Sequence, residues 1–206
     1  VTPLWIACQN GHVDAAWLLL DKGADVHRPR KDGWTPLFVA CQKGHVDAER
    51  LLLDKGAEVD RATKKGTTPL FTACASGHVD AARLLLDKGA DVNQANENDV
   101  TPLNIACEKG YADAARLVLD KGADVNRPRK DGWTPLFVAC QKGHVDAALL
   151  LLKCDAEVDL ATKKGTTPLF TACDEGHVDA ARLLLETGAD VHKATNSNQT
   201  PLHAAS

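Results

Sequence analysis

Residues 35–60 read TPLFVACQKGHVDAERLLLDKGAEVD, and this stretch contains the start and stop signals of two consecutive short helices. Thr35 is a good N-cap, because its side-chain oxygen can accept a hydrogen bond from the first helical turn. Pro36 suits the first helical position, where its missing N–H would have had no partner. Gly44 then ends the first helix.

A second helix is expected over about residues 45–55, because Gly56 can adopt the left-handed conformation that closes a helix. Helices of roughly 8 to 11 residues are marginal alone in water, so each pair depends on its neighbours for burial. Between the second helix and the next Thr-Pro lie Pro, Asp and Gly turn signals, as in residues 26–34. These signals predict a projecting, hairpin-like finger.

The Thr-Pro-Leu motif recurs every 33 residues without insertion or deletion, starting at residues 2, 35, 68, 101, 134, 167 and 200. Self-similarity at such a period predicts an array of stacked units, here a single domain over residues 1–206 with six full repeats and a truncated seventh. A longer period lies on top of the first, because residues 1–99 and 100–198 align without gaps at roughly three-quarters identity. We interpret this as duplication of a three-repeat block.

These motifs resemble the ankyrin-repeat family, which shares the 33-residue period, the Thr-Pro-Leu helix start, the Gly-His junction and the Gly-Ala-Asp-Val ending. The resemblance covers essentially the whole chain. It implies an all-α solenoid of stacked antiparallel helix pairs with projecting β-hairpin-like fingers. The chain departs from the family pattern at the residue after Thr-Pro-Leu, where the usual His is found only at position 203. The other units carry Trp5, Phe38, Phe71, Asn104, Phe137 and Phe170.

The composition indicates a globular protein in a reducing compartment. Hydrophobic residues make up 44% of the chain and charged residues 25%, and no apolar run approaches the length of a membrane span. Seven cysteines cannot form a complete set of disulfides within one chain, and six of them fall at the same place in the repeat. We therefore expect buried thiols, a cytoplasmic location and no membrane partner.

The chain shows no signature of a catalytic or metal site. Cys-x-x-x-His recurs, as at Cys41 and His45, but a glycine separates the two residues and zinc needs about four converging ligands. His-Val-Asp places its His and Asp two residues apart, where they do not face each other on a helix. The chain has no Gly-x-Ser-x-Gly elbow and no glycine-rich phosphate loop. We expect a protein that is not an enzyme and that needs no metal or cofactor.

Four residues interrupt the pattern. Glu49 falls on the apolar stripe where other units carry Ala, so it must either reach solvent or weaken its repeat. Asp99 and Asp155 replace glycines of the finger and of the helix C-cap, the second at a cost of about 1 kcal/mol if the conformation is kept. Cys154 has no counterpart in other units, and the sequence leaves open whether it is reactive.

Basic residues gather at the expected finger tips, although the chain as a whole has a net charge of −4. The candidates for partner contact there are Arg30, Lys31, Lys65, Arg129, Lys130 and Lys164, and Trp34 and Trp133 stand beside them. Exposed Trp next to Arg is typical of an interface hot spot. The resemblance also implies that partners bind the polar residues that end the first helices, namely Gln42, Lys43, Glu108, Lys109, Gln141 and Lys142.

These observations predict a protein-binding module whose partner carries acidic and apolar side chains. An engineered or fragmentary scaffold without a ligand of its own is the alternative. Nucleic-acid binding through the basic fingers is disfavoured by an isoelectric point near 6.1 and by the acidic finger at Glu97 and Asp99. The ends lack the polar capping repeats that keep such arrays soluble, which predicts end-to-end self-association at high concentration.

Overall fold

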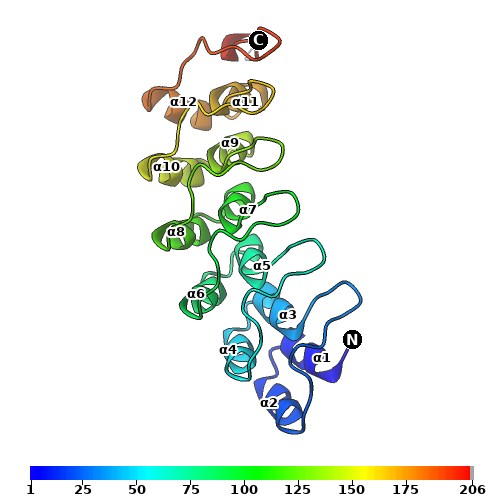
Figure 1. The fold of residues 1–206 in the computed structure, drawn as a ribbon. Coiled ribbons are helices and arrows are strands. Elements are labelled where there is room, and N and C mark those ends of the chain that lie inside the picture. Colours follow the sequence, from blue (N-terminus) through cyan, green and yellow to red (C-terminus); the bar gives the residue numbers. More distant parts are fainter. Residues whose placement is uncertain (205–206) are drawn as a thin grey trace. The chain divides into compact units, whose positions relative to one another are not determined.

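The computed structural model describes residues 1–204, which form short α-helices arranged in pairs (Figure 1). The chain divides into two compact units, residues 1–97 (unit 1) and 98–206 (unit 2). Unit 1 contains α1 (Pro3–Gln9), α2 (Val13–Asp21), α3 (Pro36–Lys43), α4 (Val46–Asp54), α5 (Pro69–Ser76) and α6 (Val79–Asp87). Unit 2 contains α7 (Pro102–Lys109), α8 (Ala112–Asp120), α9 (Pro135–Gln141), α10 (Val145–Lys153), α11 (Pro168–Asp174), α12 (Val178–Glu186) and α13 (Pro201–Ala204).

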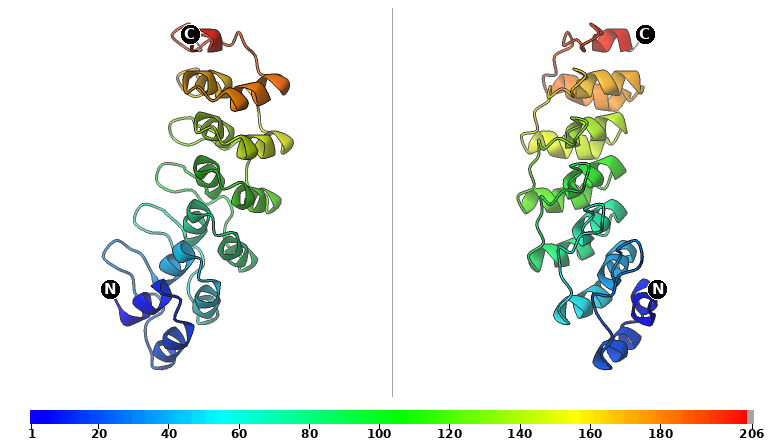
Figure 2. Two further views of the ribbon diagram at one scale, coloured as in Figure 1. Left: turned by 180° about the vertical axis from the view of Figure 1, so that it is seen from behind. Right: turned by 45° about the vertical axis from the view of Figure 1, so that its right-hand side comes forward.

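Within each unit the helices form two rows. In unit 1, α1, α3 and α5 pack side by side, and α2, α4 and α6 form a second row behind them (Figures 1 and 2). In unit 2, α7, α9, α11 and α13 form the first row, and α8, α10 and α12 form the second. No β-strand occurs among residues 1–204, so the prediction of an all-α stack of helix pairs is confirmed.

The first helix of each pair begins as the sequence predicts. Pro occupies the first helical position, and the preceding Thr is extended, with its hydroxyl oxygen 3.1–3.2 Å from a backbone N–H three residues on in α1, α5, α7, α9 and α11. Thr35 makes no such bond. Two repeats of unit 2 add a second contact to this cap: Asn104 Oδ1 accepts from Thr101 at 2.9 Å, and His203 Nδ1 lies 2.8 Å from the Thr200 hydroxyl. Asn104 and His203 can make this contact because their side chains carry a polar atom, which the Phe at the same position of other repeats lacks.

The hydrophobic core runs between the two rows of helices within each unit. The leucine of each Thr-Pro-Leu motif is buried in α1, α3, α5, α7, α9 and α11, and Cys8, Cys41, Cys74, Cys107 and Cys140 are fully buried below it. All seven cysteines are present as thiols. Burial raises the pKa of Cys74 and Cys140 to about 12, so these side chains act as small apolar groups at neutral pH.

The histidines that precede α4, α6, α10 and α12 connect neighbouring repeats within a unit. The Nε2 of each lies within hydrogen-bond distance of a backbone carbonyl of the preceding repeat: His45 to Gln9 O (3.1 Å), His78 to Gln42 O (3.0 Å), His144 to Glu108 O (3.2 Å) and His177 to Gln141 O (3.0 Å). Since a carbonyl oxygen only accepts, Nε2 must carry the proton. The ring rests on a glycine: a Cβ at Gly110 would lie 2.7 Å from His144 Nδ1. The Gly-His junction therefore serves packing between repeats.

The fingers have the predicted hairpin shape, although they contain no strand. Asp99, which replaces a glycine in one of them, has φ +56°. Asp155, which replaces a C-cap glycine, has φ +63°, and Cys154 beside it is half-buried. Both Asp residues thus keep the left-handed conformation that the glycine would have had. No helix among residues 1–204 is long and apolar enough to cross a membrane.

Glu49 does not reach solvent. Its side chain is fully buried in α4, at the position held by buried Ala16, Ala82, Ala115 and Ala148 in the second helices of other repeats. Neither carboxyl oxygen has a hydrogen-bond partner, and the Cys41 thiol faces the carboxyl without the geometry of a full hydrogen bond. Burial raises the pKa of Glu49 to about 8, an effect that Arg50 only partly offsets. Of the two outcomes expected for Glu49, weakening of its own repeat is the one consistent with the structure.

Glu49 predicts a pH dependence of stability. Because its pKa is about 8 in the folded chain and ordinarily 4.5, the folded chain holds one more proton between these values. The free energy of unfolding should therefore fall as pH rises through this window, by about 1.4 kcal/mol per pH unit, and level off above it. We expect Glu49→Gln to lack this slope and Glu49→Ala to be more stable than wild type at pH 7 by about 3 kcal/mol. Urea unfolding from pH 4 to 9 measures the difference between variant and wild type, in which titration of the other groups cancels.

Asp155 predicts a stabilising substitution. Asp155→Gly should raise the free energy of unfolding by about 1 kcal/mol, because glycine adopts positive φ without a steric penalty. The matched control is Gly56→Asp at the same place in unit 1, where φ is +89° and an added Cβ would meet nothing within 4 Å. That variant should lose a similar amount. Equal stability of Asp155→Gly and wild type in urea would contradict the cost assigned to this turn.

Candidate functional site

Two fingers with identical tips carry the tryptophans predicted to bind a partner. We call residues 26–34 the first Trp finger, in unit 1, and residues 125–133 the second Trp finger, in unit 2; residues 28–34 and 127–133 both read RPRKDGW. In the first, the Arg30 N–H donates to the Trp34 carbonyl at 2.8 Å and the Asp32 carboxylate accepts from the Trp34 N–H at 3.2 Å. The second finger repeats both bonds at 3.0 and 3.1 Å.

Each tryptophan is held at the base of its finger by the helix that follows. The Trp34 and Phe38 ring centroids are 5.6 Å apart, and those of Trp133 and Phe137 are 5.1 Å apart, both pairs tilted. The two phenylalanines are buried, whereas the two tryptophans are only half-buried. Each indole is therefore fixed on one side and available to solvent on the other, which is the arrangement expected of an anchor for a partner.

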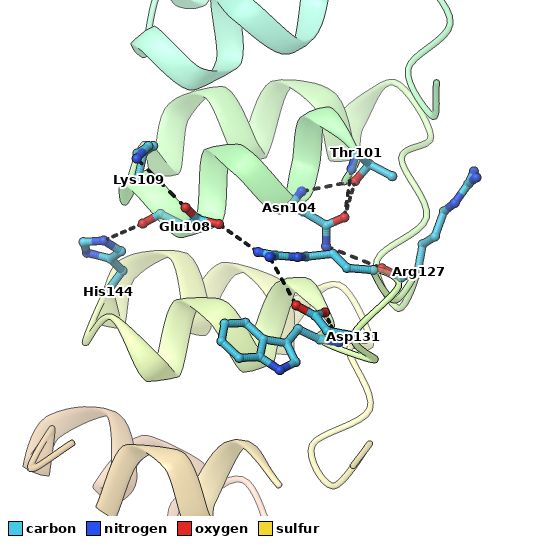
Figure 3. Close-up of polar contacts among 9 residues, drawn as sticks. Thr101, Asn104, Glu108, Lys109, Arg127, Asp131 and His144 are labelled. Atoms are coloured by element: carbon cyan, nitrogen blue, oxygen red, sulfur yellow. Dashed lines mark hydrogen bonds and ion pairs between the residues drawn. The ribbon is translucent and has the colours of Figure 1, made fainter. Parts of the chain in front are cut away.

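In unit 2 the second Trp finger is bound to the end of α7 by an ion pair to Glu108 (Figure 3). Arg129 Nη1 lies 2.8 Å from Glu108 Oε2, and Nη2 lies 3.2 Å from Asp131 Oδ2. The guanidinium also stacks on the Trp133 ring at 5.2 Å. Only 18% of the Arg129 side chain is exposed. Two carboxylates and an aromatic ring therefore leave this Arg little capacity for a partner.

In unit 1 the equivalent Arg30 has fewer partners. Its guanidinium pairs with Asp32 at 3.2 Å and stacks on the Trp5 ring of α1 at 4.8 Å, and 39% of the side chain is exposed. Trp5 itself is buried. A contact between Trp5 and this finger was not predicted from the sequence. Trp5 occupies the same position in its repeat as Asn104, which contacts the second Trp finger. This equivalence could have predicted that Trp5 contacts the first Trp finger.

The remaining predicted contact residues fall into two groups. Lys109 is exposed, with its Nζ 4.0 Å from Glu108 Oε1, and Gln141 and Glu108 are half-buried. The others are exposed: Lys31, Gln42, Lys43 and Lys65 in unit 1, and Lys130, Lys142 and Lys164 in unit 2. The structure thus brings Arg30 together with Trp34, and Arg129 with Trp133 and Glu108.

Backbone bonds between neighbouring fingers fix their tips. The Lys65 carbonyl accepts from the Glu97 N–H at 3.0 Å, and the Lys164 carbonyl accepts from the Asn196 N–H at 3.0 Å. In unit 2, Asn104 Nδ2 donates to the Arg127 carbonyl at 3.4 Å, which links α7 to the second Trp finger (Figure 3). The Asn three residues after Thr101 is a capping-box signal that sequence reasoning did not use.

A metal role for the repeated Cys and His is not supported by the contacts. The Nε2 atoms of the four histidines that connect neighbouring repeats donate to backbone carbonyls. Among residues 1–204, no three His, Cys, Asp or Glu side chains gather as a metal ion would require.

A family model described as ankyrin repeats (3 copies) matches the chain in overlapping segments, residues 4–96, 49–129, 93–162, 127–195 and 154–206. The chain belongs to the ankyrin-repeat family. It is similar to the crystal structure of the human ASB11 ankyrin repeat domain, with a TM-score of 0.91 and 30% identity over 100% of this chain and 92% of that one. It is also similar to the ankyrin repeat domain of Bcl-3, a member of the IkappaB family, with a TM-score of 0.87 and 28% identity over 100% and 94% of the two chains. None of the curated protein sequences compared matches it.

The match confirms the predicted fold, an ankyrin-repeat solenoid of stacked helix pairs with fingers. Ankyrin repeats are general protein–protein interaction modules and non-enzymatic scaffolds. The family therefore accounts for the class of function, whereas the contacting residues must be argued from this chain.

The two arginines should differ in their contribution to stability. Arg129→Ala removes a stacked, largely buried side chain and leaves Glu108 with only the more distant Lys109, so we expect a loss of about 1–2 kcal/mol in the free energy of unfolding. Arg30→Ala removes an exposed pair and should change it by less than about 0.5 kcal/mol. Urea unfolding followed by circular dichroism compares the two variants. Equal losses would show that the ion pair with Glu108 adds nothing.

Proposed function

We propose that this ankyrin-repeat chain is a non-catalytic module that binds a protein partner through its Trp fingers and the ends of its first helices. The observation that carries the proposal is the pair of half-buried tryptophans, each packed on a buried phenylalanine and each next to an arginine. Rigid aromatic side chains of this kind lose little conformational entropy on binding, and with Arg they dominate interface energetics. The partner would carry apolar groups for the indoles and acidic groups for the basic tips.

Nucleic-acid binding is less well supported. Phosphate binding needs arginines and lysines that are available to neutralise charge, and Arg129 already pairs with Glu108 and Asp131. The chain also carries a net charge of −4. Seven thiols, five of them fully buried, support a reducing intracellular compartment.

Self-association, or a spacer role without a ligand, is the alternative. Apolar side chains are exposed in both units, for example Trp17 and Leu18 in α2 and Leu202 in α13. A cavity of about 300 Å³ lies beside α13, lined by Leu169, Leu185, Val191, Pro201 and other residues. These exposed groups support contact between copies at high concentration, which sedimentation velocity would detect as a rising average mass.

Capture from a cell lysate tests the proposal. The wild-type chain is compared with a variant carrying Ala at Trp34, Trp133, Arg30 and Arg129, and bound proteins are identified by mass spectrometry. The matched control carries Ala at the exposed arginines of the second helices, Arg83, Arg116 and Arg182. We expect proteins that are retained by wild type and control and lost by the finger variant.

Two other outcomes would contradict the proposal. An identical, sparse set of proteins from all three baits would favour the spacer role. Loss in the control alone would place the binding surface on the second helices. Circular dichroism of each bait shows that it is folded, so that a loss of capture is a loss of contact.

A further inference from the structure

The two Trp fingers have identical tips but face first helices that have diverged. The second Trp finger faces α7, whose contacting residues are Asn104 and Glu108. The corresponding residues of α1, 99 positions earlier, are Trp5 and Gln9. The finger sequence is thus constant, and only the surface behind it has changed.

This change alters the charge available at the fingertip. Glu108 places a carboxylate 2.8 Å from Arg129 Nη1, so unit 2 supplies a counter-ion from its own chain. Gln9 is neutral, and the ion pair that Arg30 makes is with Asp32, through Nη2. Arg30 Nη1 therefore lacks the carboxylate partner that Glu108 provides to Arg129 Nη1. The Trp5 ring instead supports the guanidinium from below at 4.8 Å.

We propose that the first Trp finger binds a carboxylate of an acidic partner segment at Arg30, while the second Trp finger is closed to such a ligand by its own Glu108. This inference rests on the proposed protein-binding function and assigns the two fingers unequal parts in it. Glu108 serves as an intramolecular model of the ligand, because it shows that the RPRKDGW finger accepts a carboxylate at Arg Nη1.

The surroundings of Arg30 fit an acidic segment longer than one residue. Arg28 and Lys31 are exposed on the same finger, and Lys64 and Lys65 are exposed on the next finger of unit 1. The half-buried Trp34 offers an adjacent apolar surface. A planar guanidinium held on an aromatic ring is well suited to a carboxylate, since both groups are planar and can pair in bidentate fashion.

The tryptophans provide a site-resolved test. The chain has four, and their indole N–H signals can be followed in ¹H–¹⁵N spectra after assignment by single Trp→Phe changes. The probe is an acetylated peptide of six glutamates and two leucines, with a glutamine version as the control. We expect the signals of Trp5 and Trp34 to shift in a saturable manner with the acidic peptide alone, while those of Trp17 and Trp133 stay in place.

Two reciprocal substitutions test the cause. Gln9→Glu gives unit 1 the counter-ion of unit 2 and should weaken peptide binding at Trp34 by about fivefold. Glu108→Gln removes that counter-ion and should make Trp133 respond to the peptide, which converts one binding site into two.

Several results would overturn the inference. Equal shifts of Trp34 and Trp133 in the wild type would show that Glu108 does not close the second finger. Unchanged affinity in Gln9→Glu would show that Arg30 is not the carboxylate contact. Shifts of the same size with a 12-nucleotide single-stranded DNA would show an unspecific anion site. The first two results leave the protein-binding function standing if capture still depends on the tryptophans; loss of both the peptide shifts and the capture would remove the function as well.

Discussion

Within each unit the structure depends on the contact between one repeat's histidine ring and the backbone of the repeat before it. Each helix has nine residues or fewer, which is too short to be stable alone in water, so a repeat persists only if its neighbour holds it. The histidine meets this need twice. Its Nε2–H satisfies a carbonyl at the end of the preceding first helix, and its ring packs on a glycine that has no side chain to obstruct it. The distance between neighbouring repeats is therefore limited by this hydrogen bond and by the contact between the imidazole ring and the glycine. The same contact holds the ends of the first helices next to the fingers.

Much of this architecture could be predicted from the sequence, because its signals are local. Pro36 and Gly44 mark the two ends of α3, and each acts through its own backbone conformation. The role of His45 could not be predicted in this way, since its partner is the carbonyl of Gln9, 36 residues earlier. The Cys-x-x-x-His spacing gave no indication that the histidine ring nitrogen would donate to a backbone carbonyl of another repeat. Contacts between repeats depend on how repeats stack, and no local signal encodes that stacking.

In the candidate site, too, local features could be predicted from the sequence and contacts between repeats could not. Trp34 and Trp133 were predicted to be exposed, whereas the structure shows both to be half-buried. The sequence did not show that Arg129 would pair with two carboxylates and Arg30 with only one, because the fingers themselves are identical. The difference comes from the residue at the end of the first helix, which is Gln9 in α1 and Glu108 in α7. Nothing in the sequence of either helix marks this residue as part of a binding site. A residue in the framework can thus decide what an unchanged finger is able to bind.

Glu49 shows that a repeat protein can accept an unfavourable residue in one repeat and still fold. A buried carboxyl without a hydrogen-bond partner is among the costliest features a small core can hold, and the folded chain responds by keeping the proton. The cost remains within unit 1, since stability in such arrays is close to a sum of repeat and nearest-neighbour contributions. The same near-independence lets Gln9 and Glu108 differ without disturbing either fold, so that a duplicated sequence can keep two copies of one finger that differ in the counter-ions of their arginines.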